Sequence, residues 1–589
     1  MLRTLQNAME RLHAAQNANG SWTGELSASA LATATAVCAL RLGGAAADSA
    51  LIDTGLRWLA GHANADGGWG DTPESPSNIS TSTLCWAVLR AADAHEAVTA
   101  RGQAWLAATA GDITPEALAR AIYARYGGDR TFATPILTLC ALCGVLGEGR
   151  AAWRHVIPLP FELATLPQGF YRFVRMPVVS YALPALIAIG LVRFRRCAPR
   201  NPVARLLRSL ATRRVLRKIA DLQPPHGGFL EATPLTAFVT MSLIAAGETQ
   251  HPVVQRGLDF LRRAARPEGC WPIDTNLATW VTTLAVNALA HTPRAAAAGE
   301  WLLRQQFRTA HPYTDAAPGG WAWTDLPGGV PDADDTAGAL LALHRLGLSG
   351  EDARRAVEAG MTWLLDLANT DGGLPTFSRG WGYLPFDRSC PDITIHALRA
   401  FAAWRAPLPR SLQARVDRAT RRGLSYLRRS QRADGSWVPL WFGNTQARGM
   451  DNPVYGTARV VLGLAELVSG ETSDLPDVAA MLSRGSAFLA AAQGADGGWG
   501  GDRGAPASIE ETALAVEALC ACVTAQACAE AHDACVRAVA GGVRRLRELT
   551  EDGRHFPPAP IGLYFAKLWY HEKLYPVIFT VAALRRANA

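Results

Sequence analysis

Gly328-Gly-Val-Pro-Asp-Ala-Asp-Asp-Thr-Ala337 is the stretch from which the fold and the chemistry can be worked out. It crowds three carboxyl groups, those of Asp332, Asp334 and Asp335, in front of an apolar segment that we predict to be a helix. A helix N-terminus favours acidic residues, so plain capping accounts for one or two of them. Burial raises a carboxyl pKa by up to ~3–5 units, so one of three crowded acids can stay protonated. The stretch alone leaves helix capping and proton donation as equal alternatives.

The composition is that of a large chain rich in apolar residues. Of its 589 residues, 49% are apolar and only 19% are charged, and Trp occurs 18 times. This length allows about three or four domains with sizeable cores. Residues 1–6 contain no apolar run, so we expect no signal peptide.

The 11 cysteines lie mostly inside Ala/Leu-rich runs. Cys140 and Cys143 have no second pair at zinc spacing, and the cysteines near His532 fit small apolar side chains better than ligands. We therefore expect no metal and a reducing cytoplasm.

A basic tract and the apolar segment before it suggest a membrane partner. The tract supplies most of the formal charge of +7, and its members are Arg193, Arg195, Arg196, Arg200, Arg205, Arg208, Arg213, Arg214, Arg217 and Lys218. Residues 176–192 just upstream are almost wholly apolar, but they are short for a membrane span and contain two prolines. Apolar surface beside arginine is typical of a segment that enters one leaflet and binds acidic headgroups, and a buried core helix is the alternative. We predict contact with the cytoplasmic face of a membrane through residues 172–218, and no nucleic-acid partner.

Self-similarity is the strongest feature of the rest of the sequence. A short segment with an aromatic residue before Leu leads to a Gly-rich turn, which usually ends in another aromatic residue. The turns are Asp66-Gly-Gly-Trp69, Gly269-Cys-Trp271, Asp371-Gly-Gly373, Asp434-Gly-Ser-Trp437 and Asp496-Gly-Gly-Trp499, with weaker copies ending at Trp22, Phe229 and Phe556. Their spacing of roughly 40–60 residues is typical of helix-pair repeats. Ala/Leu runs of helical length, without strand alternation, lie between the turns.

This repeat pattern predicts an all-α fold made of two α/α toroids. The inner ring of a toroid is buried on both sides, so its residues should be small and apolar, as the Ala/Leu runs are. We place the first toroid in residues 1–105 and 215–300, and the second in residues 301–589. The segment 106–214 between them contains the basic and apolar material and is expected to pack with the first toroid.

The Gly-rich turns resemble the QW repeats of squalene-hopene and oxidosqualene cyclases. The acidic stretch Pro331-Asp-Ala-Asp-Asp-Thr-Ala337 is similar to the DxDDTA motif of the squalene-hopene branch. The resemblance covers nearly the whole chain. It implies a class II terpene cyclase that protonates a terminal alkene of squalene, or of a related polyprenoid, and drives cationic cyclisation to a hopanoid-like product. It also implies that no cofactor is needed, and it leaves a homodimer open.

By the same resemblance, Asp334 is the proton donor, and Asp332 and Asp335 support it. Asp392 and His396 are four residues apart, hence on one helix face, and resemble the family segment whose histidine hydrogen-bonds the donor. Tyr455 resembles a residue that helps to hold water near the acid. The resemblance further implies that the following residues line the pocket: Trp280, Trp323, Trp441, Tyr181, Phe132, Phe238, Phe556, Tyr564, Arg130, Thr233 and Pro234.

The implied chemistry has simple physical demands. An alkene is a very weak base, so the acid must be strong when it acts, and a protonated His396 would stabilise the carboxylate that forms. Aromatic faces stabilise carbocations by ~0.5–2 kcal/mol each without attacking them. A dry cavity prevents early capture by water.

Departures from the family pattern leave other functions open. Where the family has Glu at the far end of the cavity, residues 27–35 and 77–83 offer hydroxyl groups, so the last step is not defined. A shorter or functionalised polyprenyl substrate is therefore a second hypothesis. A third is a prenyltransferase-like toroid with a zinc site that includes Cys390, Asp392 and His396. A fourth is a toroidal binding module without chemistry.

Overall fold

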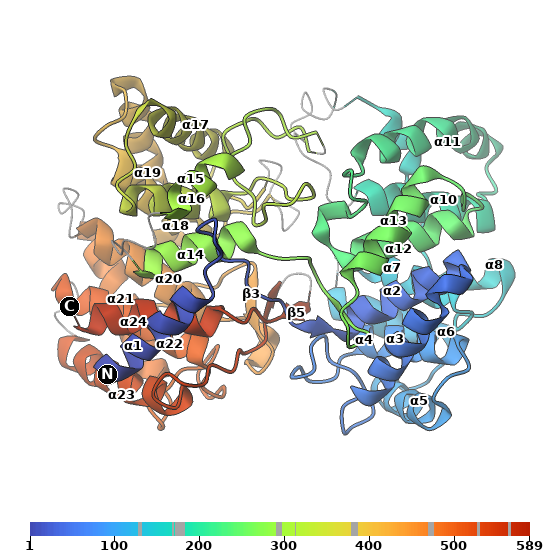
Figure 1. Ribbon diagram of the computed structural model, residues 1–589, viewed down its shortest axis with the longest axis horizontal. Coiled ribbons are helices and arrows are strands. Elements are labelled where there is room, and N and C mark those ends of the chain that lie inside the picture. Colours follow the sequence, from blue (N-terminus) through green and yellow to red (C-terminus); the bar gives the residue numbers. More distant parts are fainter. Residues whose placement is uncertain are drawn as a thin grey trace.

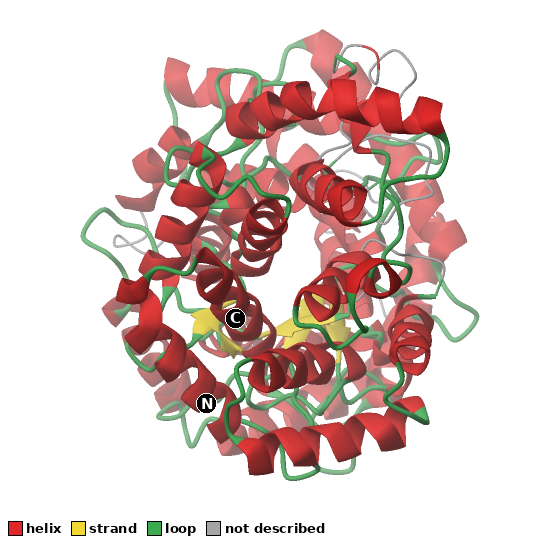
Figure 2. Cartoon of the chain, turned by 90° about the vertical axis from the view of Figure 1, so that its right-hand side faces the viewer, coloured by secondary structure: helices red, strands yellow, loops and turns green. Residues whose placement is uncertain are grey.

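The computed structural model contains two α/α barrels side by side, which confirms the predicted fold class (Figure 1). Seen after a turn of 90°, the helices encircle the axis of the barrel (Figure 2). The structure describes residues 1–127, 132–167, 170, 183–289, 297–312, 314–377, 387–468, 476–526, 531–563 and 567–588.

The C-terminal barrel has a closed ring of inner helices and a layer of outer helices. Each inner helix packs on the next and the last returns to the first, in the order α14 (Ala278–Leu289), α16 (Ala333–Arg345), α18 (Pro391–Trp404), α20 (Pro453–Val468), α22 (Ile509–Thr524) and α24 (Tyr575–Asn588). The outer helices are α1 (Leu2–Ala14), α15 (Ala298–Gln305), α17 (Glu351–Leu367), α19 (Arg410–Ser430), α21 (Pro476–Ala492) and α23 (His532–Leu549).

The N-terminal barrel repeats this plan. Its inner helices are α2 (Ala30–Gly43), α4 (Ile79–Ala91), α7 (Ala133–Leu142), α10 (Leu183–Arg196) and α12 (Thr233–Ala245), and α12 packs against α2. Around them lie α3 (Ser49–Gly61), α5 (Glu96–Ala110), α6 (Pro115–Tyr126), α11 (Pro202–Leu222) and α13 (Pro252–Ala264). Shorter helices are η1 (Ala46–Asp48), α8 (Gly149–Ala152), η2 (Phe161–Thr165), η3 (Phe229–Glu231) and, in the other barrel, η5 (Arg448–Met450). Every residue of α2 from Ala30 to Leu40 is buried, as expected of an inner helix.

The Gly-rich turns fasten outer helices to inner ones. At Trp437 the indole N–H donates to the Leu427 carbonyl of α19 at 2.8 Å, and the backbone N–H donates to Thr457 Oγ1 of α20 at 3.0 Å. A Cβ at Gly485 would lie 2.9 Å from the Trp437 ring, so glycine allows α21 to approach. The same two bonds recur at Trp22, Trp69, Trp271, Trp321 and Trp499.

Short strands lie where the two barrels meet. Antiparallel β1 (Ala28–Ser29) and β2 (Trp271–Pro272) form one pair. A three-stranded antiparallel sheet has the order β3 (Phe442–Asn444), β4 (Ile561–Leu563) and β5 (Leu568–Tyr570). Figure 1 shows β3 and β5 between the barrels.

Two helices lie across the domain boundary expected from the sequence. Helix α1 packs on α24, and α14 packs on both α16 and α24, so both belong to the C-terminal barrel. The boundaries at 1–105 and 215–300 assigned them to the first toroid. The reason is that the C-terminal ring closes through helices from distant parts of the chain. The segment 106–214 supplies α6, α7, α10 and α11 to the first barrel.

The described part of the apolar segment 176–192 is a core helix. Ile187, Ala188, Ile189, Leu191 and Val192 of α10 are fully buried. For residues 183–192 this contradicts the prediction that the apolar segment enters a leaflet, because α10 occupies an inner position of the ring; residues 176–182 lie outside the described part of the chain. Within the described residues, no helix combines the length and the apolar character needed to cross a membrane.

Candidate active site

Three acidic side chains meet where α16 begins. Asp332 is the N-cap, and its carboxyl group accepts the backbone N–H groups of Asp334 and Asp335 at 2.9 Å each. Capping therefore occupies one acid only. It turns the first helical residues so that Asp332, Asp334 and Asp335 all lie on the wall of one cavity.

Asp334 is held from behind by a histidine. Its Oδ1 lies 2.5 Å from Nδ1 of His396 on α18, and the side chains of Asp334 and His396 are 17% and 4% exposed. Asp392 lies one turn before His396, where its Oδ1 accepts the thiol of Cys390 at 2.6 Å. The packing of α16 on α18 thus brings together residues that are far apart in the sequence.

The surroundings favour the protonated forms of the supporting acids. Burial raises the pKa of Asp332 to about 7. Burial and then the charge of Asp332 raise the pKa of Asp335 well above its usual range. Burial, followed by the charge of Asp334, raises the pKa of Asp392 to about 6. Close carboxyl groups in a poorly solvated site share protons, so this cluster can hold a proton at neutral pH.

His396 differs from the sequence-based expectation of a protonated histidine. Burial lowers the pKa of His396, because the charged imidazolium is poorly solvated there. Positive charge comes instead from Arg459 of α20. Burial opposes that charge, but electrostatic interactions with Tyr455 and with the acids Asp334, Glu517 and Asp392 raise the pKa of Arg459 above its usual value. A second cavity of about 240 Å³, whose lining includes the charged residues Arg459 and Glu517, also borders His396.

In front of Asp334 lies an apolar cavity of about 380 Å³ between the two barrels. Helices of the N-terminal barrel contribute aliphatic and aromatic side chains, and the C-terminal barrel contributes the acids and most of the large rings. The aromatic lining consists of Tyr126, Phe132, Phe238, Trp280, Trp323, Phe377, Trp441, Phe442, Tyr570 and Tyr575. The three acids at the start of α16 lie together on this wall, and aromatic rings form much of the remainder.

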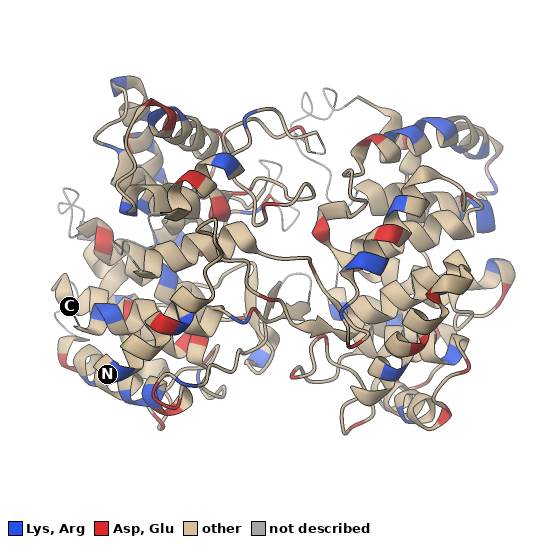
Figure 3. Cartoon of the chain, in the orientation of Figure 1, with Lys and Arg blue, Asp and Glu red and all other residues tan. Residues whose placement is uncertain are grey.

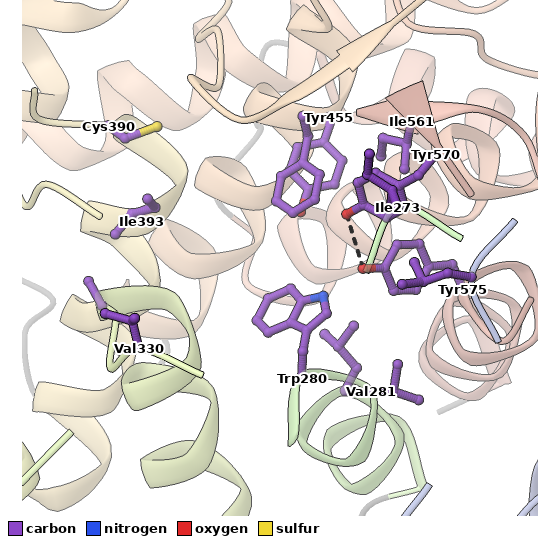
Figure 4. Packing of buried hydrophobic residues seen from close by; sticks show 14 of the residues in the cluster. Ile273, Trp280, Val281, Val330, Cys390, Ile393, Tyr455, Ile561, Tyr570 and Tyr575 are labelled. Carbon is purple, nitrogen blue, oxygen red and sulfur yellow. Dashed lines mark hydrogen bonds between the residues drawn. The ribbon is translucent and has the colours of Figure 1, made fainter. Parts of the chain in front are cut away.

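Ring contacts fix the orientation of this lining. Phe377 lies between Trp323 and Trp441, with centroid distances of 6.2 and 5.5 Å. Figure 4 shows Trp280 facing Tyr570 and Tyr575, whose hydroxyl groups are 3.4 Å apart. Such mutual packing restricts the rings to defined rotamers, so their faces form a stable surface.

The structure brings many of the sequence-predicted residues to this cavity. Trp280, Trp323, Trp441, Phe132 and Phe238 line it, as does Pro234. His396, Asp392 and Tyr455 lie behind the wall, where all three are buried.

Other predicted residues are not at the described cavity wall. Thr233 is buried at the start of α12 without lining the cavity. Phe556 lies elsewhere, with the Arg11 guanidinium 5.6 Å from its ring centroid, because the turn that carries it packs on α1. Tyr181, Tyr564 and Arg130 lie outside the described residues.

Several residues of the site were not predicted from sequence. Arg459 follows Tyr455 by one helical turn, and this spacing is a signal that could have revealed it. Tyr126, Phe377, Tyr570 and Asp274 have no comparable pattern around them, since distant segments bring them to the wall.

The described residues do not support the zinc hypothesis. Among them, no group of three His, Cys, Asp or Glu side chains is placed to hold a metal ion. Cys390 donates to Asp392, while His396 contacts Asp334.

An acid triad that opens on an aromatic cavity between two α/α barrels is the architecture of a class II terpene cyclase. Sequence comparisons agree. The model of the squalene-hopene cyclase C-terminal domain matches residues 272–589, and that of the N-terminal domain matches residues 5–203. The chain belongs to the squalene-hopene cyclase family.

Individual relatives are similar to this chain at about 30% identity over part of their length. The squalene–hopene cyclase of Bradyrhizobium diazoefficiens is 28% identical over 330 residues, which are 49% of this chain and 46% of that protein. The drimenyl diphosphate synthase of Streptomyces showdoensis is 32% identical over 320 residues, 47% of this chain and 54% of that protein. The chain thus spans about half the length of the curated relatives it matches. The structure of ent-copalyl diphosphate synthase from Streptomyces platensis has a TM-score of 0.61 at 20% identity, over 100% of both chains, and it supports the fold alone.

Proposed function

We propose that this chain is a cyclase that protonates a terminal alkene of a polyprenoid and lets the resulting carbocation form rings. Squalene is the first candidate substrate, with a hopanoid-like product. One observation carries the proposal. Asp334 faces a 380 Å³ aromatic cavity, while its other side contacts the buried His396 at 2.5 Å.

In this mechanism the Asp334 O–H bond breaks and its proton forms a C–H bond at the terminal alkene carbon. The alkene π electrons make that bond, which leaves a carbocation on the neighbouring carbon. The new carboxylate at Asp334 is stabilised by the nearby charge of Arg459 and by the His396 ring. No other reactant is needed, because the remaining alkenes of the substrate supply the electrons for ring closure.

The cation then travels along the aromatic wall. Trp280, Trp323 and Trp441 present π-faces that stabilise positive charge by about 0.5–2 kcal/mol each and cannot quench it. Burial of the apolar substrate excludes water, which would otherwise end the reaction early.

The test is a side-by-side incubation of the purified protein with squalene and with C15–C35 polyprenyl substrates, in detergent, with product identification by gas chromatography and mass spectrometry. Cyclic products from any of them support the proposal. No cyclic product from the whole set would contradict it.

A shorter substrate with an anionic headgroup is the second candidate, and two basic residues support it. Arg125 donates to the Lys567 carbonyl at 3.3 Å, next to Tyr126 and Leu568 of the cavity wall. Burial and the charge of Arg125 lower the pKa of Lys567, as expected when cations crowd together. Asp451 already offsets part of that repulsion, and an anionic headgroup would offset more of it. Higher turnover of a polyprenyl diphosphate than of squalene would favour this candidate.

We further propose that α11 rests on an anionic membrane surface at the cytoplasmic face. Val203, Leu206, Leu207 and Leu210 lie on one side of α11 and are 55–67% exposed. Leu163 of η2, which packs on α11, is 49% exposed. Arginines are concentrated along the same helix (Figure 3). Exposed leucines flanked by arginine suit the boundary between headgroups and acyl chains, where a polyprenoid would be dissolved.

Replacing Leu206, Leu207 and Leu210 together with Ser is expected to lower binding to phosphatidylserine-containing vesicles by at least about tenfold. Each exposed leucine loses its favourable transfer to the lipid, about 1.5–3 kcal/mol when burial is complete. Vesicle co-sedimentation measures the effect. Val536→Ser, at an exposed apolar residue of α23, is the matched control and should bind as the wild type does. Equal binding by the triple variant would contradict the proposal.

A further inference from the structure

A carboxyl group apart from the triad faces the same cavity. Among the described residues that line it, the carboxyl side chains are those of Asp274, Asp332, Asp334 and Asp335. The last three form the acid site at α16. Asp274 comes from a different segment, between β2 and α14, and has no part in the mechanism given above.

Asp274 is held next to a second buried acid. Ala232 and Asp274 form an antiparallel backbone bridge, and the Thr275 N–H donates to the Glu231 carbonyl at 3.2 Å. These backbone contacts bring Glu231 next to the segment that carries Asp274. Burial, and then the charge of Glu231, raise the pKa of Asp274 well above its usual range. The charge of Glu231 therefore acts on Asp274, and once deprotonated Asp274 is a stronger proton acceptor than an ordinary aspartate.

Glu231 is fully buried and only half satisfied. Its Oε1 accepts the Gly328 N–H at 2.7 Å and lies 2.6 Å from Nε2 of His226. Its Oε2 is buried and finds no hydrogen-bond donor among the described residues. The φ of Glu231 is +58°, which few residues other than glycine adopt. A strained, buried carboxyl with a free acceptor is costly for stability, which is typical of functional positions.

A third titratable residue lies between Glu231 and the protein surface. His226 is the next titratable group beyond Glu231, and its side chain is 26% exposed. Glu231 thus contacts His226, and its backbone adjoins the segment of Asp274 at the cavity. The hydroxyl-rich segments 27–35 and 77–83 offer no carboxylate that could accept a proton from a carbocation.

We propose that the Asp274–Glu231 pair accepts the proton whose loss ends the cyclisation; this rests on the function proposed above. A C–H bond next to the final cationic carbon breaks, and its electron pair becomes the C=C bond of the product. The proton goes to the cavity-facing carboxylate of Asp274, the deprotonated form, whose charge changes from −1 to 0. Asp274 releases this proton before the next turnover. Asp274 is the catalytic residue, and Glu231 and His226 are positioning residues.

The experiment compares product ratios rather than rates alone. Asp274→Asn, Asp274→Glu and Glu231→Gln are incubated with whichever of squalene and the C15–C35 polyprenyl substrates the wild type converts. Asp325→Asn is the matched control, because Asp325 is an exposed acid whose charge also acts on the Glu231 region but which does not line the cavity. Products are quantified by gas chromatography and mass spectrometry, and thermal unfolding is recorded for each variant.

The expected result is that Asp274→Asn still consumes substrate, since Asp334 starts the reaction, but makes at least tenfold less of the wild-type alkene relative to alcohols and other alkenes. Glu231→Gln should shift the ratio in the same direction, Asp274→Glu should restore it in part, and Asp325→Asn should keep it. If Asp274→Asn does not fold, the ratio from Glu231→Gln decides by the same criterion. Wild-type ratios in both variants, or an alcohol as the main wild-type product, would overturn the proposal. An inactive wild type would instead reject the proposed function and this inference with it.

Discussion

Replacing Asp334 with Asn is expected to lower turnover of the polyprenoid by about 10²–10⁴-fold, the range that a general acid contributes. The amide has the same shape as the carboxyl group but carries no proton acidic enough for an alkene. The helix should still form, because its N-cap is Asp332 and only the backbone N–H of residue 334 takes part in capping. The variant therefore separates chemistry from folding.

Product formation by Asp334→Asn is measured against Asp352→Asn under the same conditions. Asp352 also lies in the first turn of a helix, α17, but its side chain is 77% exposed and does not line the cavity. Asp352→Asn should retain wild-type turnover. Wild-type activity in Asp334→Asn would remove Asp334 from its role as the donor. A large loss in Asp352→Asn would show that the assay reports folding instead.

The fold class could be predicted from sequence because each repeat contains the residues that pair its two helices. Each repeat consists of a Gly-rich turn, an aromatic residue and an Ala/Leu run. This pattern predicts that the helices are paired and that one helix of each pair is buried. The repeats do not predict which helices close each ring. The sequences of α1 and α14 resemble those of the other helices, and only their packing on α24 assigns them to the C-terminal barrel.

The acid end of the site was predictable for a similar reason. Asp332, Asp334 and Asp335 are adjacent in the chain, and Asp392 and His396 share one helix face. Asp274 and Glu231 could not be found in this way. Each is a single acid in an ordinary sequence context, and only a backbone bridge between distant segments makes them a pair. Arg459 likewise acts on Asp334 only because α20 packs against α18, and this packing was not predictable from sequence.

Replacing Trp437 with Ala is expected to destabilise the C-terminal barrel by about 3–5 kcal/mol, as is typical of a large buried aromatic side chain. Trp437 is fully buried, and its indole N–H satisfies the Leu427 carbonyl at 2.8 Å. The variant leaves both a cavity under Gly485 and a carbonyl without its donor. At roughly 2–4 °C per kcal/mol for a unit of 150–250 residues, the unfolding temperature should fall by about 10 °C.

Differential scanning calorimetry measures this change, and Trp105→Ala provides the control. Trp105 is a partly exposed residue of the outer helix α5, and its indole N–H donates to Asp66. Its removal should therefore lower the unfolding temperature much less than the removal of Trp437 does. Equal losses in the two variants would contradict the view that the Gly-rich turns hold the layers together.

The same variant should lose activity at the temperature at which its barrel unfolds. Trp437 is joined through Thr457 to α20, which also carries Tyr455 and Arg459. Helix α20 packs on α18, which holds His396, and α18 packs on α16, which holds Asp334. In a closed ring each inner helix is positioned by its two neighbours, so loosening α20 disturbs the acid without touching it. Activity that survives beyond the calorimetric transition would show that α16 and α18 hold the acid site without the rest of the ring.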